Sequence, residues 1–291
     1  PPPPPPPPFL LIRRPPRSTP HMSSRQRHLT IPCEMCIRDR SVNKFIFLFP
    51  RGAQAGIFMH AIFEELDFTD ASPQTIAKLA ATCLDRYGFD AGWLPAVVEM
   101  VTNVITTPLS DEDSSFCLSD LKQGSWLTEL EFFFPLSFLT SDALRSALTE
   151  YAAHYQPVNL TAVLSSLQFK PTVGMIRGFM DMVFEHGGRY YLLDWKSNHL
   201  GYCQEEYSQE AMKREMEKNL YPFQYLLYTV ALNRYLALRI RNYDYRQHFG
   251  GVRYLFIRGM SPHHGVFRDL PPVELIHALT VLLHTSERRL P

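Results

Sequence analysis

Two short apolar segments, residues 178–184 and 190–196, each carry a carboxylate at a position that strand alternation places on a buried face. Residues two apart in a β-strand share a face, so Asp181 and Asp194 share theirs with apolar neighbours, and Lys196 lies on the same face as Asp194. A buried carboxylate without a partner costs several kcal/mol. Both carboxylates should therefore be paired, protonated or bound to a metal ion, which constrains any fold that this chain can adopt.

The residues between the two segments predict a tight turn. Glu185-His-Gly-Gly188 ends on two glycines, which supply the positive φ angles that a short hairpin loop needs. The two strands should therefore pair as a hairpin, with both carboxylates and a lysine at its edge. Such an arrangement suits a divalent metal site that hydrolyses phosphodiesters. The alternative is a structural network of charges with Arg177, Arg189 or Lys196.

The expected chemistry needs few protein ligands. Mg²⁺ prefers hard oxygen ligands and keeps several waters, so two aspartates, a backbone carbonyl and a substrate phosphate suffice. A bound metal ion lowers the pKa of water and offsets charge on the phosphate oxygens. Lys196 is placed to hold or deprotonate the attacking water and to stabilise the pentacovalent state. The Asp-x-Lys triplet alone is weak evidence, because Asp120-Leu-Lys122 repeats it in a polar region that predicts a solvated surface pair.

A histidine on a predicted helix is the next candidate. Residues 56–66 have the spacing of an amphipathic helix that carries His60. Gly56 would let this helix pack closely and aim the imidazole at the metal, with Glu64 as an orienting partner. The alternatives are a satisfied core histidine and a Glu64 that only faces solvent.

Polar residues on a later helix could contact a phosphate or a base. Gln224 and Tyr228 are four residues apart and share a helical face, with Tyr235 further along it. Three basic residues upstream could contact a nucleic acid backbone: Lys213, Arg214 and Lys218. The alternative is an ordinary amphipathic helix with core aromatics and a solvated basic face.

The chain divides into a proline-rich start and one folded domain. Residues 1–42 are expected to be disordered or artefactual, since twelve of the 24 prolines fall within the first 32 residues. The domain covers residues 43–291, with a catalytic core at about 170–260. A Ser/Asp-rich loop is expected at 110–115. Helices are expected at 56–66, 74–84, 91–105, 141–155, 208–238 (broken near Tyr221-Pro222) and 272–285, and strands at 129–134 (closed by Pro135), 178–184, 190–196 and 251–258. This order predicts a mixed α/β core, a small sheet flanked by helices.

Composition narrows the class of protein but not its ligand. A hydrophobic content of 45% suffices for a core, and the apolar runs are too short to span a bilayer. Five scattered cysteines favour a reduced, cytoplasmic compartment, and Cys33-Glu-Met-Cys36 has no second pair to complete a metal site. The formal net charge of zero neither supports nor excludes a nucleic acid partner.

In combination, several segments resemble a known family, the C-terminal nuclease domain of RecB from the RecBCD helicase–nuclease (exodeoxyribonuclease V). The resemblance covers roughly residues 47–260. The segments that carry it are Phe49-Pro-Arg-Gly52, Gly56-x-x-x-His60, Gly178-Phe-x-Asp181, Tyr190-Tyr-Leu-Leu-Asp-x-Lys-Ser-Asn198 with Leu200-Gly201, Gln224-Tyr-x-x-Tyr228 and Phe249-Gly-Gly-Val252.

The resemblance implies a fold and a set of ligands. The family has the PD-(D/E)xK nuclease fold, here with a helical insertion between the first helix and the catalytic hairpin. His60, Asp181 and Asp194 would be the metal ligands, the backbone carbonyl of Trp195 would complete the set, and Lys196 would be the catalytic lysine.

Further residues follow from the same resemblance. Gln224 and Tyr228 match the glutamine–tyrosine motif that is thought to position DNA. Glu129 or Glu131 would be a weaker contributor to the site.

The implied function is a Mg²⁺-dependent DNA nuclease that acts on single-stranded ends in double-strand break repair and recombination, with RecC- and RecD-type subunits as partners. No P-loop of the form Gly-x-x-x-x-Gly-Lys-Ser/Thr occurs, so the helicase motor is absent from these 291 residues, and a fragment or a free-standing nuclease module is expected. The alternatives are a catalytically silent module that binds DNA or subunits, another endonuclease of the same fold, and an acid/base enzyme that uses the carboxylates without metal.

Overall fold

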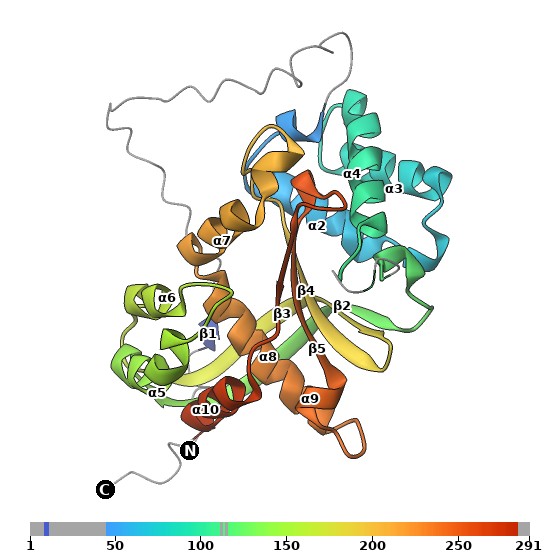
Figure 1. The fold of residues 1–291 in the computed structure, drawn as a ribbon. Helices are drawn as coiled ribbons and strands as arrows, with labels where there is room; N and C mark the ends of the chain where they lie inside the picture. The colour runs from blue at the N-terminus through green and yellow to red at the C-terminus, as the bar shows by residue number, and fades with distance from the viewer. Residues whose placement is uncertain (1–8, 12–44, 111–112, 114–115, 285–291) are drawn as a thin grey trace, which may run out of the picture.

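The computed structural model describes residues 9–11, 45–110, 113 and 116–284, which form a mixed sheet with helices on both faces (Figure 1). The strand order is β1-β3-β4-β5-β6, and β2 also pairs with β3. The β1–β3 and β4–β5 pairs are parallel, and the others are antiparallel. The strands are β1 (Phe9–Leu11), β2 (Trp126–Leu139), β3 (Thr172–His186), β4 (Arg189–Lys196), β5 (Phe249–Phe256) and β6 (Val266–Asp269).

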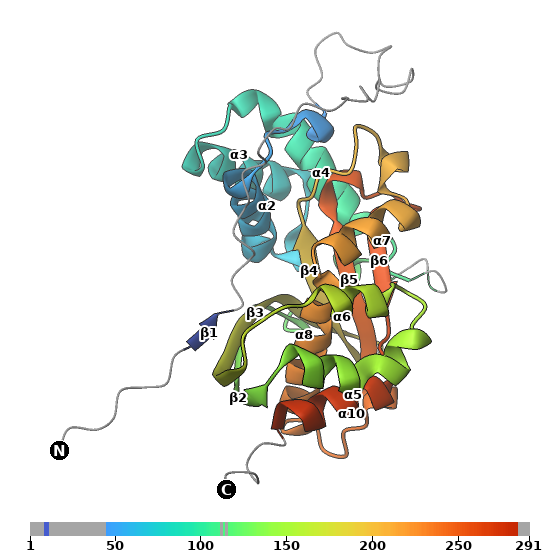
Figure 2. The ribbon, with the colours of Figure 1, turned by 90° about the vertical axis from the view of Figure 1, so that its left-hand side faces the viewer.

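The helices fall into two groups, which Figures 1 and 2 show on opposite sides of the sheet. The first group is α2 (Ala53–Glu65), α3 (Pro73–Arg86) and α4 (Leu94–Thr106). The second group is α5 (Ser141–Ala153), α6 (Leu160–Ser166), α7 (Gln209–Lys218), α8 (Tyr221–Ala237) and α10 (Val273–His284), and the short α9 (Tyr245–His248) precedes β5. Among the described residues, no helix is long and apolar enough to cross a membrane.

Each group of helices encloses its own hydrophobic core, because the central strands bury both of their faces. In β4, Leu192 lies in the core under α8, whereas Leu193 and Trp195 lie in the core under α2–α4. The Trp195 ring stacks on Phe63 of α2 with the ring centroids 4.4 Å apart. Strands buried on both faces read as continuous apolar runs rather than as alternating ones. The predicted mixed α/β fold class is therefore confirmed.

The predicted pairing of residues 178–184 and 190–196 as a hairpin is also confirmed. β3 and β4 pair from Met182–Leu193 to His186–Arg189, which leaves Gly187 and Gly188 as a two-residue loop. Their φ angles are 61° and 79°, the left-handed values that favour glycine at both positions of such a turn.

One expectation about a strand was wrong. β2 continues through Pro135 to Leu139 instead of ending before the proline. Pro135 pairs in register with Met175. This is tolerated because, among the described strands, β2 pairs only with β3, so its other edge needs no ladder donor. The sequence analysis also did not predict α6 and β6, which are short elements of seven and four residues.

Several expectations fall on residues that the structure does not describe. They include most of segment 1–42, with Cys33 and Cys36, and four residues of the predicted loop at 110–115.

Gly178 makes room for an aromatic pair on the neighbouring strand. It lies opposite Phe132 in the β2–β3 register, and a Cβ at this position would lie 2.6 Å from Cζ of Phe132. The Phe132 ring packs edge-on against Tyr228 of α8 at 5.3 Å. We expect Gly178→Ala to lower the free energy of unfolding by about 1–3 kcal/mol through this overpacking. Urea denaturation measures the loss, and an additional Phe132→Leu change should restore part of it; a Gly178→Ala protein as stable as the wild type would contradict this packing.

Asp269 at the end of β6 is a buried carboxylate that makes stability depend on pH. Tyr155 donates a hydrogen bond to its Oδ2 atom. Burial nevertheless raises the pKa of Asp269 from its usual value near 3.8 to about 6. The folded state therefore holds this proton more tightly than the unfolded state, so the contribution is full below pH 4 and is lost as pH rises through 6.

We expect the wild type to lose roughly 3 kcal/mol relative to Asp269→Asn between pH 4 and pH 7.5, since asparagine does not titrate. Urea denaturation of both proteins across this pH range measures the difference. A difference in unfolding free energy that does not change with pH would contradict this assignment.

Candidate active site

The two predicted carboxylates meet at the open end of the β3–β4 hairpin. Asp181 precedes and Asp194 follows the last registered pair, Met182–Leu193, so both lie where the ladder ends. Both are buried, with relative exposures of 8% and 3%. The Trp195 N–H donates to Oδ2 of Asp181 at 2.9 Å. The Asp181 carboxylate thus accepts a backbone hydrogen bond from β4 beyond the point where the strand ladder stops.

Asp194 is paired with the lysine that follows it on the same face. The Lys196 ammonium contacts Oδ2 of Asp194 as an ion pair, although this buried oxygen accepts no hydrogen bond of regular geometry. Burial, and then the nearby Asp181 charge, raise the pKa of Asp194 from 3.8 to about 6 despite this lysine. Burial is the larger cause, so the site itself disfavours the charged form of Asp194.

The structure brings His60 to the same place from α2. Its Nδ1 atom lies 3.4 Å from Oδ2 of Asp181, and the imidazole is buried. Close packing of α2 makes this possible, since a Cβ on Gly56 would lie 3.1 Å from Oγ of Ser197. Glu64 on the same helix is exposed. The expectation of a glycine that allows close approach thus agrees with the packing.

Gln224 on α8 connects the lysine to two tyrosines. Its Oε1 atom accepts hydrogen bonds from Lys196 Nζ at 3.3 Å and from the Tyr254 hydroxyl at 3.1 Å. Its Nε2 atom donates to the Tyr228 hydroxyl at 2.9 Å. The predicted pair of Gln224 and Tyr228 therefore lies beside Lys196 and is joined by a hydrogen bond.

Two aromatic rings that sequence reasoning missed flank the same ammonium group. Lys196 Nζ lies 3.9 Å from the centroid of Tyr221, the first residue of α8, and 4.8 Å from that of Tyr254 on β5. Both distances are within the range of a cation–π interaction. The parallel pairing of β4 with β5 places Tyr254 opposite Asp194, and this pairing is seen only in the structure.

Two further predicted contributors, Glu129 and Glu131, lie on β2. In the β2–β3 register, Glu129 falls between the pairs Thr128–Met182 and Leu130–Met180, level with Asp181. Glu131 pairs with Arg177 on the half-exposed surface of the sheet. Glu129 is exposed and has a φ of 50°, a left-handed conformation that is uncommon outside glycine.

The other charged residues that the sequence analysis considered have the following partners and exposure. Of the residues named for a structural charge network, Arg189 donates to the backbone carbonyls of Arg246 and Phe249, and Arg177 pairs with Glu131. Lys196 does pair with Asp194, as that alternative also expected. Asp120 and Lys122 are exposed, as predicted for a surface pair. On α7, Lys218 pairs with Glu215.

The side chains of this site can be compared with the ligands that a divalent cation prefers. Within the described ranges, no three His, Cys, Asp or Glu side chains are already grouped as a metal site. The chemistry nevertheless fits Mg²⁺, because two buried carboxylates repel each other, and the buried Oδ2 of Asp194 lacks a regular hydrogen bond. His60, Asp181, Asp194 and the Trp195 carbonyl remain the predicted ligands.

A helix-flanked mixed sheet with two carboxylates and a lysine on neighbouring strands belongs to the PD-(D/E)xK class of nuclease cores. No protein-family model matches the chain. It is 42% identical over 232 residues to RecBCD enzyme subunit RecB of Escherichia coli, covering 78% of this chain and 19% of that protein. The same subunit of Haemophilus influenzae is 40% identical (79% and 18%), and that of Mycobacterium tuberculosis is 31% identical (80% and 24%). The chain belongs to the RecB family, and it spans about a fifth of the length of these relatives.

Proposed function

We propose that the chain is a Mg²⁺-dependent deoxyribonuclease module of RecB type, which hydrolyses phosphodiester bonds at DNA ends, mainly in single strands, in double-strand break repair and recombination. The observation that carries this proposal is the buried junction of Asp181, Asp194 and Lys196. A bound cation would stabilise two carboxylates buried together, and Asp-x-Lys on a strand end is the arrangement predicted for this chemistry.

The residues of the site have separate roles in this proposal. Bound Mg²⁺ would supply an activated water and offset charge on the phosphate. His60, Asp181, Asp194 and the Trp195 carbonyl would hold the ion. Lys196 would donate to the phosphate oxygens or move the proton of the attacking water.

The neighbours of Lys196 fix where that ammonium lies. Gln224 accepts a hydrogen bond from it, and the rings of Tyr221 and Tyr254 flank it. A held ammonium loses little freedom when it reaches the reacting phosphate, and this favours catalysis. Gln224 and Tyr228 would in addition help to position the DNA strand.

Partner subunits form part of the proposal. The relatives are named as subunits of the RecBCD enzyme, so RecC- and RecD-type subunits are the proposed partners of the longer protein. Large apolar side chains stay exposed on β2 and β3, including Phe133 and Phe138 at 70% and 63%. Exposed apolar surface of this kind is what a partner would cover.

The test uses two single-stranded substrates, an end-labelled linear oligonucleotide and a circle, each with Mg²⁺ or with EDTA. We expect cleavage of the linear strand only with Mg²⁺ and much slower cleavage of the circle. Cleavage in EDTA would contradict the metal requirement, and equal cleavage of the circle would contradict the preference for ends. Binding of DNA without any cleavage would favour the silent module.

A further inference from the structure

An exposed arginine lies beside the candidate active site with part of its guanidinium held by neutral side chains. Arg51 precedes α2, and its Nη2 atom donates to Nε2 of His199 and to the hydroxyl oxygen of Tyr202, both at 2.9 Å. Its Cζ atom lies 5.3 Å from the centroid of the Tyr202 ring. The two partners come from the loop that follows β4, so they fix the plane of the guanidinium relative to that loop.

The remaining donors of this guanidinium are accessible to a ligand, because Arg51 is exposed. Arginine has five N–H donors, and the three on Nε and Nη1 of Arg51 have no partner within the described part of the chain. In that part, Arg51 also forms no ion pair with a carboxylate. Burial, Arg51 and Arg258 lower the pKa of His199 to about 4, so this histidine is neutral at pH 7. Its Nε2 atom also lies 3.1 Å from the Phe47 carbonyl oxygen. The Glu206 carboxylate beside this cluster accepts the backbone N–H of Tyr202.

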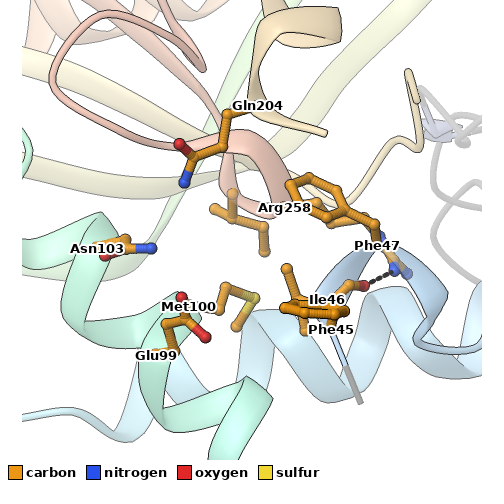
Figure 3. Close-up of a pocket in the computed structure, with 9 residues that line it drawn as sticks. Phe45, Ile46, Phe47, Glu99, Met100, Asn103, Gln204 and Arg258 are labelled. Atoms are coloured by element: carbon orange, nitrogen blue, oxygen red, sulfur yellow. Dashed lines mark hydrogen bonds between the residues drawn. The ribbon is translucent and has the colours of Figure 1, made fainter. Parts of the chain in front are cut away.

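A second, buried arginine ties this cluster to the catalytic strand. Arg258 is 3% exposed, and its side chain reaches the segment before Arg51, where Figure 3 shows its hydrogen bond to the Ile46 carbonyl. Its guanidinium donates to the carbonyls of Ile46 (3.0 Å), Phe49 (3.1 Å), Pro50 (2.7 Å) and Ser197 (3.0 Å). Ser197 directly follows Lys196. The Arg258 guanidinium therefore links Pro50, which precedes Arg51, to Ser197, which follows Lys196.

The distance from the proposed ligands indicates which part of a substrate Arg51 would meet. α2 begins at Ala53 and carries His60, so a rise of 1.5 Å per residue places Arg51 roughly 10–15 Å from His60 along the helix. The first turn of α2 has no acidic residue and no side-chain cap, so its positive end adds to the local field. This separation places Arg51 away from the proposed metal ligands, where it would meet a phosphate other than the one that is cleaved.

We propose that Arg51, oriented by His199 and Tyr202, binds a backbone phosphate of the DNA strand other than the one that is cleaved. The free edge of the guanidinium can donate two parallel hydrogen bonds to a phosphodiester, which a lysine cannot do. Such a contact would fix the register of the strand without reading its sequence. This inference rests on the proposed function, because it assigns a subsite to the same substrate.

The experiment measures binding apart from cleavage. A fluorescein-labelled single-stranded oligonucleotide is titrated with the full chain in EDTA at several salt concentrations, and binding is followed by fluorescence anisotropy. We expect Arg51→Gln to raise Kd about five- to tenfold at low salt and to reduce the slope of log K against log salt by about 0.7. Arg51→Lys should recover only part of the affinity, because it restores the charge without the planar fork.

A matched control distinguishes the loss of the proposed Arg51–phosphate contact from the loss of a positive charge anywhere on the surface. Arg239 is also exposed, at the end of α8, and its guanidinium lies 4.0 Å from the centroid of the Tyr235 ring. Arg239→Gln should change Kd less than twofold, and both variants should keep the thermal midpoint of the wild type. A wild-type Kd for Arg51→Gln, or an equal loss in Arg239→Gln, would overturn the subsite.

The proposal and the function on which it rests fail in different ways. A wild-type chain that cleaves DNA with Mg²⁺ while Arg51→Gln binds normally rejects the subsite and keeps the nuclease. A folded wild-type chain that neither binds nor cleaves single strands rejects both.

Discussion

Replacement of Lys196 by methionine is expected to lower the rate of phosphodiester cleavage by about 10²–10⁴-fold, the range for loss of a positioned acid/base group. Methionine keeps the apolar stem of the side chain between the tyrosine rings but removes the ammonium that faces Asp194. The Kd for DNA should change little, because the buried Lys196 ammonium is proposed to act mainly in the transition state of cleavage. Single-turnover cleavage of labelled DNA with saturating enzyme measures the effect.

The chain supplies its own control for this variant. Lys122 belongs to a second Asp-x-Lys triplet, and both it and Asp120 are exposed. Lys122→Met should leave the cleavage rate within twofold of the wild type. If the Lys196→Met enzyme cleaves DNA as fast as the Lys122→Met enzyme, Lys196 is not the catalytic lysine.

Replacement of Asp181 by asparagine is expected to change metal affinity and stability in opposite directions. The charge of Asp181 raises the pKa of its neighbour Asp194, so its removal should raise the free energy of unfolding in EDTA by about 1 kcal/mol. The same change removes one of the two carboxylate charges expected to attract the metal ion. We expect the Kd for Mg²⁺ to rise at least tenfold, because affinity follows the number of charged ligands.

Urea denaturation in EDTA and titration calorimetry with Mg²⁺ measure these two effects. Asparagine can still accept the Trp195 N–H, so the local fold should remain. Unchanged Mg²⁺ affinity, or a loss of stability in EDTA, would contradict a carboxylate pair that is kept for binding a cation.

The local part of the site follows from the sequence because it depends on short-range rules. Strand alternation places Asp194 and Lys196 on one face, and Gly187-Gly188 defines the turn that brings Asp181 to the same end of the hairpin. The resemblance to the RecB family added His60, which periodicity alone could not separate from a core histidine.

The parts that the sequence did not reveal depend on packing between distant segments. Tyr221 flanks Lys196 only because α8 crosses the sheet face that β4 and β5 share. Arg258 looks like a surface residue at the end of a strand, yet it is buried among carbonyl groups from two other segments. Pro135 suggested the end of a strand, because a proline is allowed in the sheet only on an edge, and sequence does not show which strand lies there.

The most direct test of the account is digestion of end-labelled single-stranded DNA with Mg²⁺ by the wild-type chain and by Asp194→Ala. We expect release of labelled fragments by the wild type and none above background by the variant, with similar thermal midpoints. Equal cleavage by the two proteins would show that the hydrolytic site lies elsewhere and would contradict the assignment of this hairpin as the active site.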